Sequence, residues 1–137
     1  AASLRGEFNA QGLELISLAA PTTSAARLPG LASSAQGYLY YVSFAGVTGA
    51  QLSDIDGVAA KVGELREHAR VPVLVGFGIK DAASATAVAH CADGVVVGSA
   101  LVDRLAGAAS PAAAADCAKA FLAPIRTALD GLSPPIG

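Results

Sequence analysis

The chain contains no methionine and no tryptophan, and only 5% of its 137 residues are aromatic. Charged residues make up 15%, no basic run is present, and the net charge is −2. Nucleic acids and anionic membranes are therefore not expected as partners. Glycine, serine or a charge interrupts every apolar run before it is long enough to cross a bilayer. The first ten residues lack the basic-then-apolar order of a signal peptide.

Only two cysteines are present, Cys91 and Cys117, and their spacing fits neither a metal site nor a disulfide framework. Both fall on alanine-rich helical patterns, so we expect them to be small residues of the core. Unpaired cysteines also fit a protein of the reducing cytoplasm. Without an initiator methionine, the chain is compatible with a start inside a longer protein. What the sequence does have is apolar content, at 53%, which is enough for a packed core.

Short apolar runs alternate with longer stretches of helical periodicity. Residues 13–18, 38–43, 71–75 and 94–97 read as strands. Five helices are expected. The first covers residues 24–34, the second is capped by Asp54 or Asp56, and the third is capped by Asp81 and ends near residue 89. The fourth covers residues 99–105, and the fifth covers residues 110–129 with Pro111 in its first turn. Residues 1–12 read as the remnant of a preceding helix, and residues 130–137 as a frayed tail.

Helices between consecutive strands imply parallel pairing through right-handed crossovers. Nearly continuous apolar strands are typical of sheets covered on both faces. The predicted class is therefore α/β, of the (β/α)8 TIM-barrel type. A complete barrel takes about 250 residues, so residues 1–137 are expected to form one partial domain of about four βα units.

In such folds, ligands bind beyond the carboxyl ends of the strands. Three of the four predicted strands run into glycine-containing turns there. Gly98 and Ser99 open a short helix whose free N–H groups would favour a phosphate, and Gly78 lies in the neighbouring turn. We therefore predict a phosphate site at these turns. The alternative is that the glycines only permit tight turns.

No Asp, Glu or His lies at the carboxyl end of any predicted strand, where general acid–base chemistry needs one. Lys80 and Asp81 come nearest, but Asp81 is better explained as a helix cap and Lys80 as a solvated cation. His68 and His90 both end helices and are expected to be structural. Three hydroxyls have no neighbouring base that would activate them, namely those of Ser43, Thr48 and Ser99.

Tyr40 and Phe77 are aromatic residues of strands that lead into glycine-rich loops. A flat aromatic substrate would fit against them. The alternative is that both rings only fill the mouth of the barrel.

Four motifs resemble those of the α subunits of tryptophan synthase. The first is YLYYVS at 38–43 with GVTGA at 46–50, which resembles strand six and its loop. The others are VGFGI at 75–79, DGVVVGSA at 93–100 and APT at 20–22, which resemble the turns of strands seven, eight and five. The resemblance covers residues 12–129 and implies the C-terminal half of a TIM barrel, strands 5–8.

The resemblance implies a carbon–carbon lyase of tryptophan biosynthesis. The family cleaves indole-3-glycerol phosphate to indole and glyceraldehyde 3-phosphate by a retro-aldol reaction. It needs no cofactor, and pyridoxal phosphate belongs to the partner β subunit, which receives the indole. By resemblance, phosphate contacts fall on Gly49, Gly78, Gly98 and Ser99. The indole pocket falls on Leu18, Tyr40, Phe77 and Val96, and Thr48 supports catalysis from the closing loop.

The family's catalytic Glu and Asp belong to the early strands, to which nothing in this chain corresponds. Phe44 and Ala45 also replace the basic and small polar residues of many relatives. We therefore expect the chain alone to be inactive. Two alternatives stay open: a non-catalytic module that binds phosphate or the β subunit, and another phosphate-binding barrel, such as those of histidine biosynthesis. The latter predicts an acidic residue at a strand end, and none is present.

Half a barrel would leave the outer edges of its first and last strands unpaired. Exposed edges favour pairing with other chains, so self-association is expected. The side chains that point into a complete barrel would also lose the layers covering them. We assign to that inward face Ile16, Val42, Val73, Val75 and Val95 or Val96.

Overall fold

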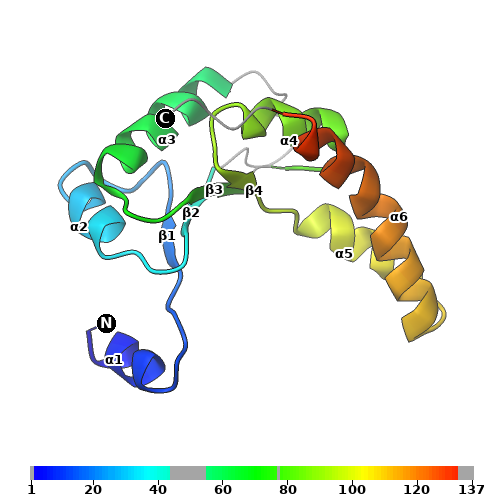
Figure 1. The fold of residues 1–137 in the computed structure, drawn as a ribbon, viewed down its shortest axis with the longest axis horizontal. Helices are drawn as coiled ribbons and strands as arrows, with labels where there is room; N and C mark the ends of the chain where they lie inside the picture. The colour runs from blue at the N-terminus through cyan, green and yellow to red at the C-terminus, as the bar shows by residue number, and fades with distance from the viewer. Residues whose placement is uncertain (1, 44–54, 77, 133–137) are drawn as a thin grey trace.

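The computed structural model describes residues 2–43, 55–76 and 78–132. Within them, helices alternate with the strands of a parallel sheet (Figure 1). In chain order the elements are α1 (Ala2–Ala10), β1 (Ser17–Ala19), α2 (Leu28–Ser33), β2 (Leu39–Val42), α3 (Ile55–His68), β3 (Val73–Gly76), α4 (Ala82–Ala89), β4 (Gly94–Val95), α5 (Ser99–Leu105) and α6 (Pro111–Asp130).

The four strands lie side by side in chain order, β1-β2-β3-β4, and each neighbouring pair is parallel. Parallel neighbours require a crossover connection, and a helix precedes each new strand in the sequence. The predicted α/β class with parallel strands is therefore confirmed. Four consecutive βα units amount to half of an eight-stranded barrel.

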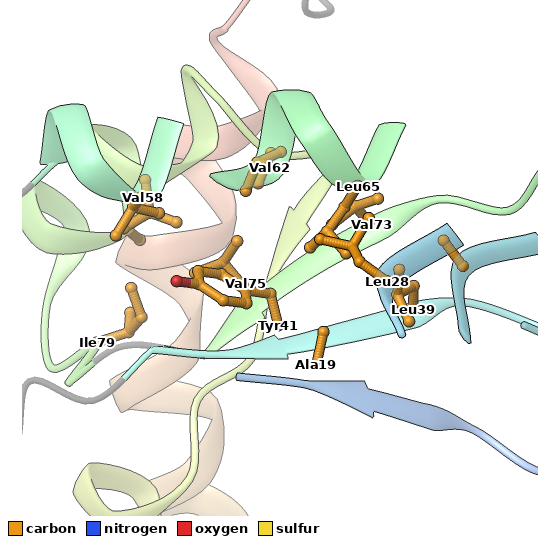
Figure 2. Packing of buried hydrophobic residues seen from close by; sticks show 14 of the residues in the cluster. Ala19, Leu28, Leu39, Tyr41, Val58, Val62, Leu65, Val73, Val75 and Ile79 are labelled. Carbon is orange, nitrogen blue, oxygen red and sulfur yellow. The ribbon is translucent and has the colours of Figure 1, made fainter. Parts of the chain in front are cut away.

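The main core lies on the face of the sheet that helices cover (Figure 2). Tyr41 and Val75 point from β2 and β3 toward Val58 and Val62 of α3. Leu28 of α2 and Val88 of α4 extend the same cluster. Six side chains are the largest that are fully buried: Leu39, Leu65, Val62, Val73, Val75 and Val88.

The opposite face of the sheet is less covered. Leu18 is 58% exposed, and its register partner Tyr40 is half-buried. The assignment of Val73 and Val75 to the inward face is wrong, because both are fully buried against the helices. Val95 likewise packs against the helix-side core. Strand residues alternate between the faces, so the residues between them, not these valines, point away from the helices.

The first strand and the first crossover helix are shorter than predicted. Residues 13–16 precede β1, since pairing with β2 begins only at Ser17, opposite Leu39. The predicted helix 24–34 is reduced to α2. Thr23 does not cap a helix: its Oγ1 accepts a bond from the Ala20 N–H at 2.9 Å, which closes a turn. Pro29 consequently lies in the first turn of α2, where it is tolerated.

The remaining boundaries are closer to prediction. Asp56 lies inside the first turn of α3, so the prediction that it caps this helix is wrong, and Asp54 is outside the described residues. β4 covers only two of the four residues predicted, although the Val96 N–H still donates to the Val75 carbonyl at 2.9 Å. α5 and α6 have the predicted positions, and Ser110 caps α6 through the Ala113 N–H at 3.1 Å.

Asp93 anchors the beginning of the central strands. Its Oδ2 accepts a 2.7 Å hydrogen bond from the Val73 N–H, and its Oδ1 lies 2.5 Å from Arg66 Nη2 at the end of α3. The Asp93 N–H in turn donates to the Val73 carbonyl at 3.0 Å. One carboxylate therefore ties α3, β3 and the approach to β4 together at the end of the sheet where β3 begins.

The first and the last elements of the described residues are helices. α1 occupies most of the predicted helical remnant at 1–12, and Arg5 donates from it to the Ser34 carbonyl at the end of α2. α6 reaches Asp130, where the frayed tail was predicted to begin, and residues 133–137 of that tail lie outside the described residues. In Figure 1, α5 and α6 extend to one side of the sheet, and α6 returns to pack on α4.

None of the helices in the described ranges combines the length and the apolar character needed to cross a bilayer.

Candidate functional site

The carboxyl ends of the strands lie at one edge of the sheet, because all four strands are parallel. The predicted binding residues that the structure describes come from this edge and from the less covered face of the sheet. Three of them, Thr48, Gly49 and Phe77, lie outside the described residues. The other six are Leu18, Tyr40, Gly78, Val96, Gly98 and Ser99.

Tyr40 and Gly76 meet on the less covered face. The register places Val42 opposite Gly76 and Tyr40 opposite Leu74, so the Tyr40 ring leans along the strand direction over the glycine. A Cβ added to Gly76 would lie 2.6 Å from Cε2 of the Tyr40 ring, and its hydroxyl oxygen would also clash. Glycine at 76 thus leaves the space that the tyrosine ring occupies.

Leu18 and Val96 extend this surface to either side. Leu18 pairs with Tyr40 across β1 and β2, so both project from the same face. Val96 follows β4 and is half-buried, and the preceding Val95 belongs to the helix-side core. Three of the four residues predicted to line the indole pocket therefore share one side of the sheet, and the fourth, Phe77, is outside the described residues. Their arrangement forms an apolar surface with the hydroxyl of Tyr40 within it.

Three of the four predicted phosphate residues follow β3 and β4, namely Gly78, Gly98 and Ser99. Gly78 has a φ of +46°, a left-handed conformation that favours glycine, and its α-carbon faces open space. Gly98 is the N-cap of α5 and forms no side-chain cap hydrogen bond. Gly98 and Ser99 are both exposed. Backbone N–H groups at an uncapped helix start are suitable donors to an anion.

Ser43 was not predicted to bind a ligand. Its Oγ is buried and has no hydrogen-bond partner within the described parts of the chain. It follows β2 directly and leads into residues 44–54, which are outside the described residues. Buried hydroxyls are rarely left unpaired in folded proteins. Ser43 is therefore a further polar group at the carboxyl edge, directly after β2.

Asp81 is a helix cap, as predicted, and does not serve as a free base. Its Oδ1 accepts the Ser84 N–H at 2.8 Å and the Ser84 hydroxyl at 2.7 Å. The Asp81 N–H donates to Ser84 Oγ at 3.2 Å, which completes a capping box. The two hydrogen bonds that the carboxylate accepts from Ser84 lower the pKa of the Asp81 carboxyl, and the charge of Lys80 adds a smaller effect in the same direction. Asp81 is thus ionised and committed to α4.

His68, His90 and Cys91 lie at the carboxyl ends of α3 and α4, away from the carboxyl edge of the sheet. His68 is the last residue of α3 and His90 is the C-cap of α4, as predicted. Cys91 is half-buried against the core, and burial raises the pKa of its thiol, partly offset by the charge of Arg66. The prediction that Cys117 is a core residue is wrong: it is exposed on α6.

No three His, Cys, Asp or Glu side chains in the described ranges lie together as a metal site would need. The described strand ends likewise carry no carboxylate or imidazole. The arrangement can hold a flat apolar group and an anion by backbone contacts. It does not by itself provide a proton donor and acceptor pair.

Sequence reasoning missed one pocket entirely. It lies between the beginning of α4, the end of α5 and the middle of α6, and has a volume of about 470 Å³. Its lining residues are far apart in sequence, so their spacing gives no signal. The cationic pair Lys80 and Arg104 becomes visible only once α5 and α6 are placed.

Comparison with known proteins identifies the family to which the chain is similar. A model of the family described as tryptophan synthase alpha chain matches residues 1–128. The tryptophan synthase alpha chain of Xanthomonas euvesicatoria pv. vesicatoria (strain 85-10) is 59% identical over 131 residues, covering 95% of this chain and 49% of that relative. That of Xylella fastidiosa (strain M12) is 57% identical over 129 residues, covering 94% and 48%. The chain spans about half the length of the curated relatives it matches.

Solved structures agree with the sequence match. The crystal structure of the tryptophan synthase alpha chain from Legionella pneumophila subsp. pneumophila superposes with a TM-score of 0.76 at 33% identity, covering 96% of this chain and 48% of that one. The alpha subunit from Campylobacter jejuni gives a TM-score of 0.76 at 27% identity, with coverage of 90% and 48%. The four βα units of this chain are therefore similar to half of each of these structures.

Proposed function

The chain belongs to the tryptophan synthase alpha chain family, and we propose that it supplies the phosphate- and indole-binding half of a lyase site. In the proposed reaction, indole-3-glycerol phosphate is cleaved to indole and glyceraldehyde 3-phosphate. The family match over residues 1–128 carries this proposal. It also disfavours the alternative of a barrel from histidine biosynthesis.

The indole ring would lie on the apolar surface formed by Leu18, Tyr40 and Val96. Support comes from the close approach of Tyr40 to Gly76, which keeps an aromatic ring on the less covered face of the sheet. Phe77, beyond the described residues, would complete the pocket. An aromatic ring stacked against another gains about 0.5–1.5 kcal/mol beyond the area buried, so the surface suits a flat substrate.

The phosphate would be held by backbone N–H groups of Gly78, Gly98 and Ser99. The left-handed Gly78 and the uncapped beginning of α5 support this assignment. Two further predicted residues, Gly49 and Thr48, are outside the described residues. Gly49 would add a loop contact to the phosphate, and Thr48 would act from the closing loop.

Proton transfer would require groups that this half of the site does not contain. Aldol cleavage needs a base and an acid near the reacting carbons, and the described strand ends carry neither. In a complete barrel the family's Glu and Asp would supply them from the other half. The indole would then pass to the β subunit, where pyridoxal phosphate is bound, in the cytoplasm.

The outer strands β1 and β4 are the edges of the described sheet, each paired with only one neighbour. Together with the exposed Leu18, they support the proposal that copies of the chain associate with one another. Edge-to-edge pairing of two copies would close an eight-stranded barrel with twofold symmetry.

The activity is tested by mixing the chain with a separately produced segment of the Xanthomonas euvesicatoria relative that covers its unmatched half. We expect no indole release by the chain alone, because each missing acid–base group costs on the order of 10²–10⁴-fold in rate. Release should appear in the mixture. Turnover by the chain alone, at the rate of a complete alpha chain, would refute the proposed division of roles.

The binding site is tested separately by titrating the chain with glycerol 3-phosphate and following backbone amide signals. The amides of Gly78, Gly98 and Ser99 should shift first. The variant Ser99→Glu should weaken binding by charge repulsion, whereas Ser33→Glu, the same change at an exposed position of α2, should not. Phosphate binding without turnover in the mixture would instead indicate a non-catalytic binding module.

A further inference from the structure

The pocket between α4, α5 and α6 combines cationic and apolar walls. Its volume of about 470 Å³ falls within the range of small-molecule sites, about 300–1,000 Å³. None of the residues predicted to bind phosphate or indole lines it. The lining comprises Lys80, Asp81, Ala82, Arg104, Cys117, Ala120, Phe121 and Pro124.

Two cations, Lys80 and Arg104, line this pocket. Within the described ranges, neither Lys80 nor Arg104 forms an ion pair. The guanidinium carbon of Arg104 lies 5.7 Å from the centre of the Phe121 ring, within the range of a cation–π contact. That contact orients the guanidinium and leaves its N–H edge available to an oxyanion.

The acidic residue in the lining does not neutralise both cations. The Asp81 carboxylate is held by the N–H and the hydroxyl of Ser84, the third residue of α4. It therefore stays fixed at the beginning of this helix rather than turning toward Arg104. The lining carries two positive charges and one negative charge, so an anion is favoured over a cation.

Pro124 removes one of the helical hydrogen-bond donors of α6, which forms one wall of the pocket. Pro124 lies inside this helix and has no N–H to donate to the carbonyl of Ala120, four residues earlier. Both residues line the pocket. A ligand N–H or O–H could bond to this carbonyl, which lacks its usual helical donor. The rings of Phe121 and Pro124 provide an apolar surface close by.

We propose that this pocket binds a small aromatic carboxylate that also carries a hydrogen-bond donor. The carboxylate would lie between Lys80 and Arg104, the ring against Phe121 and Pro124, and the donor at the Ala120 carbonyl. Each part of the ligand corresponds to one described feature of the wall. Loss of any one part should weaken binding.

Cys117 provides a built-in reporter, since it lines the same pocket and is exposed. In a Cys91→Ala background, the rate of alkylation of Cys117 by neutral iodoacetamide is measured with and without 4-hydroxybenzoate. Bound probe should cover the thiol and slow alkylation several-fold in a saturable manner. A ligand of this size is expected to have a dissociation constant on the order of 1 mM.

Matched probes and variants separate the interactions. Benzoate lacks the donor and should protect less, and neutral 4-hydroxybenzamide should protect least. Arg104→Gln and Lys80→Gln should each reduce protection by 4-hydroxybenzoate, whereas Arg126→Gln, on α6 but outside the lining, should not. The ratio of rates with and without probe is compared within each variant, so a change in thiol reactivity alone does not count.

The proposal is overturned by any of three results. One is no protection at on the order of 10 mM probe, roughly ten times the expected dissociation constant. Another is equal protection by the acid and the neutral amide. The third is full protection in both Lys80→Gln and Arg104→Gln, which would exclude the cations as the carboxylate site even if one variant were poorly folded.

Discussion

The two faces of the sheet are built from similar apolar residues but have different surroundings. On one face Leu39, Val73 and Val75 are fully buried beneath the helices. On the other, Leu18 is 58% exposed and Tyr40 is half-buried against a glycine. The first face accounts for the packing of this half-barrel. The second holds the described residues of the proposed indole site, Leu18 and Tyr40 among them.

The largest effect on stability is expected when a leucine in the core beneath the helices is truncated, compared with the same truncation of Leu18 on the less covered face. Leu65 is fully buried, so Leu65→Ala should lower the free energy of unfolding by about 2–5 kcal/mol. Leu18→Ala should change it by no more than about 0.5 kcal/mol. Urea unfolding followed by circular dichroism measures both. Equal losses would show that the two faces are covered alike.

A smaller effect is expected at the anchor of the helix-covered face. Asp93→Ala leaves the Val73 N–H without its acceptor and should cost about 1–3 kcal/mol. Asp93→Asn retains an acceptor oxygen and loses only the ion pair with Arg66. Each side chain of that pair is 32% exposed, so solvent screening limits its loss to about 0–1 kcal/mol. Indistinguishable variants would mean that the bond to Val73 contributes nothing measurable.

Substitutions on the less covered face should change the association between copies of the chain rather than the free energy of unfolding. Leu18→Ser removes an apolar contact from any interface between copies, so dimerisation should weaken on the order of tenfold. Val102→Ser is the control, because Val102 is 64% exposed but lies on α5, away from the sheet. Sedimentation velocity over a concentration series compares them. A wild-type chain that stays monomeric throughout would contradict the proposed self-association.

The sequence predicted best where a local rule decides the structure. Asp81 caps α4 because a carboxylate followed by Ser84 at the third helical position completes a capping box. Ser110 and Pro111 start α6 for similar local reasons. The strand order follows from helices placed between parallel strands. None of these inferences requires knowledge of a distant partner.

Prediction failed where a distant partner decides. Val73 and Val75 were assigned to the wrong face because nearly continuous apolar strands lack the alternation that distinguishes one face from the other. β1 starts at Ser17 because β2 offers its first partner there, at Leu39. Cys117 lies on an alanine-rich stretch that resembles a buried helix face, yet in the described structure it lines an open pocket. Tertiary contacts override such local patterns.

The smallest effect on stability is expected at low pH, from the Asp81 carboxylate that caps α4 on the helix-covered face. The hydrogen bonds from Ser84 lower the pKa of Asp81 in the folded state, so the carboxylate stabilises the fold at pH values above its unfolded pKa of about 4. This contribution is lost as the pH falls through the lower folded pKa. Asp81→Asn keeps a capping oxygen but cannot titrate, so the acid side of its stability profile should be flatter than that of the wild type.

Urea melts at a series of pH values test this expectation, with Asp116→Asn at an exposed position of α6 as the control. Identical stability profiles for the wild type and Asp81→Asn would show that the negative charge of the capping residue does not stabilise α4.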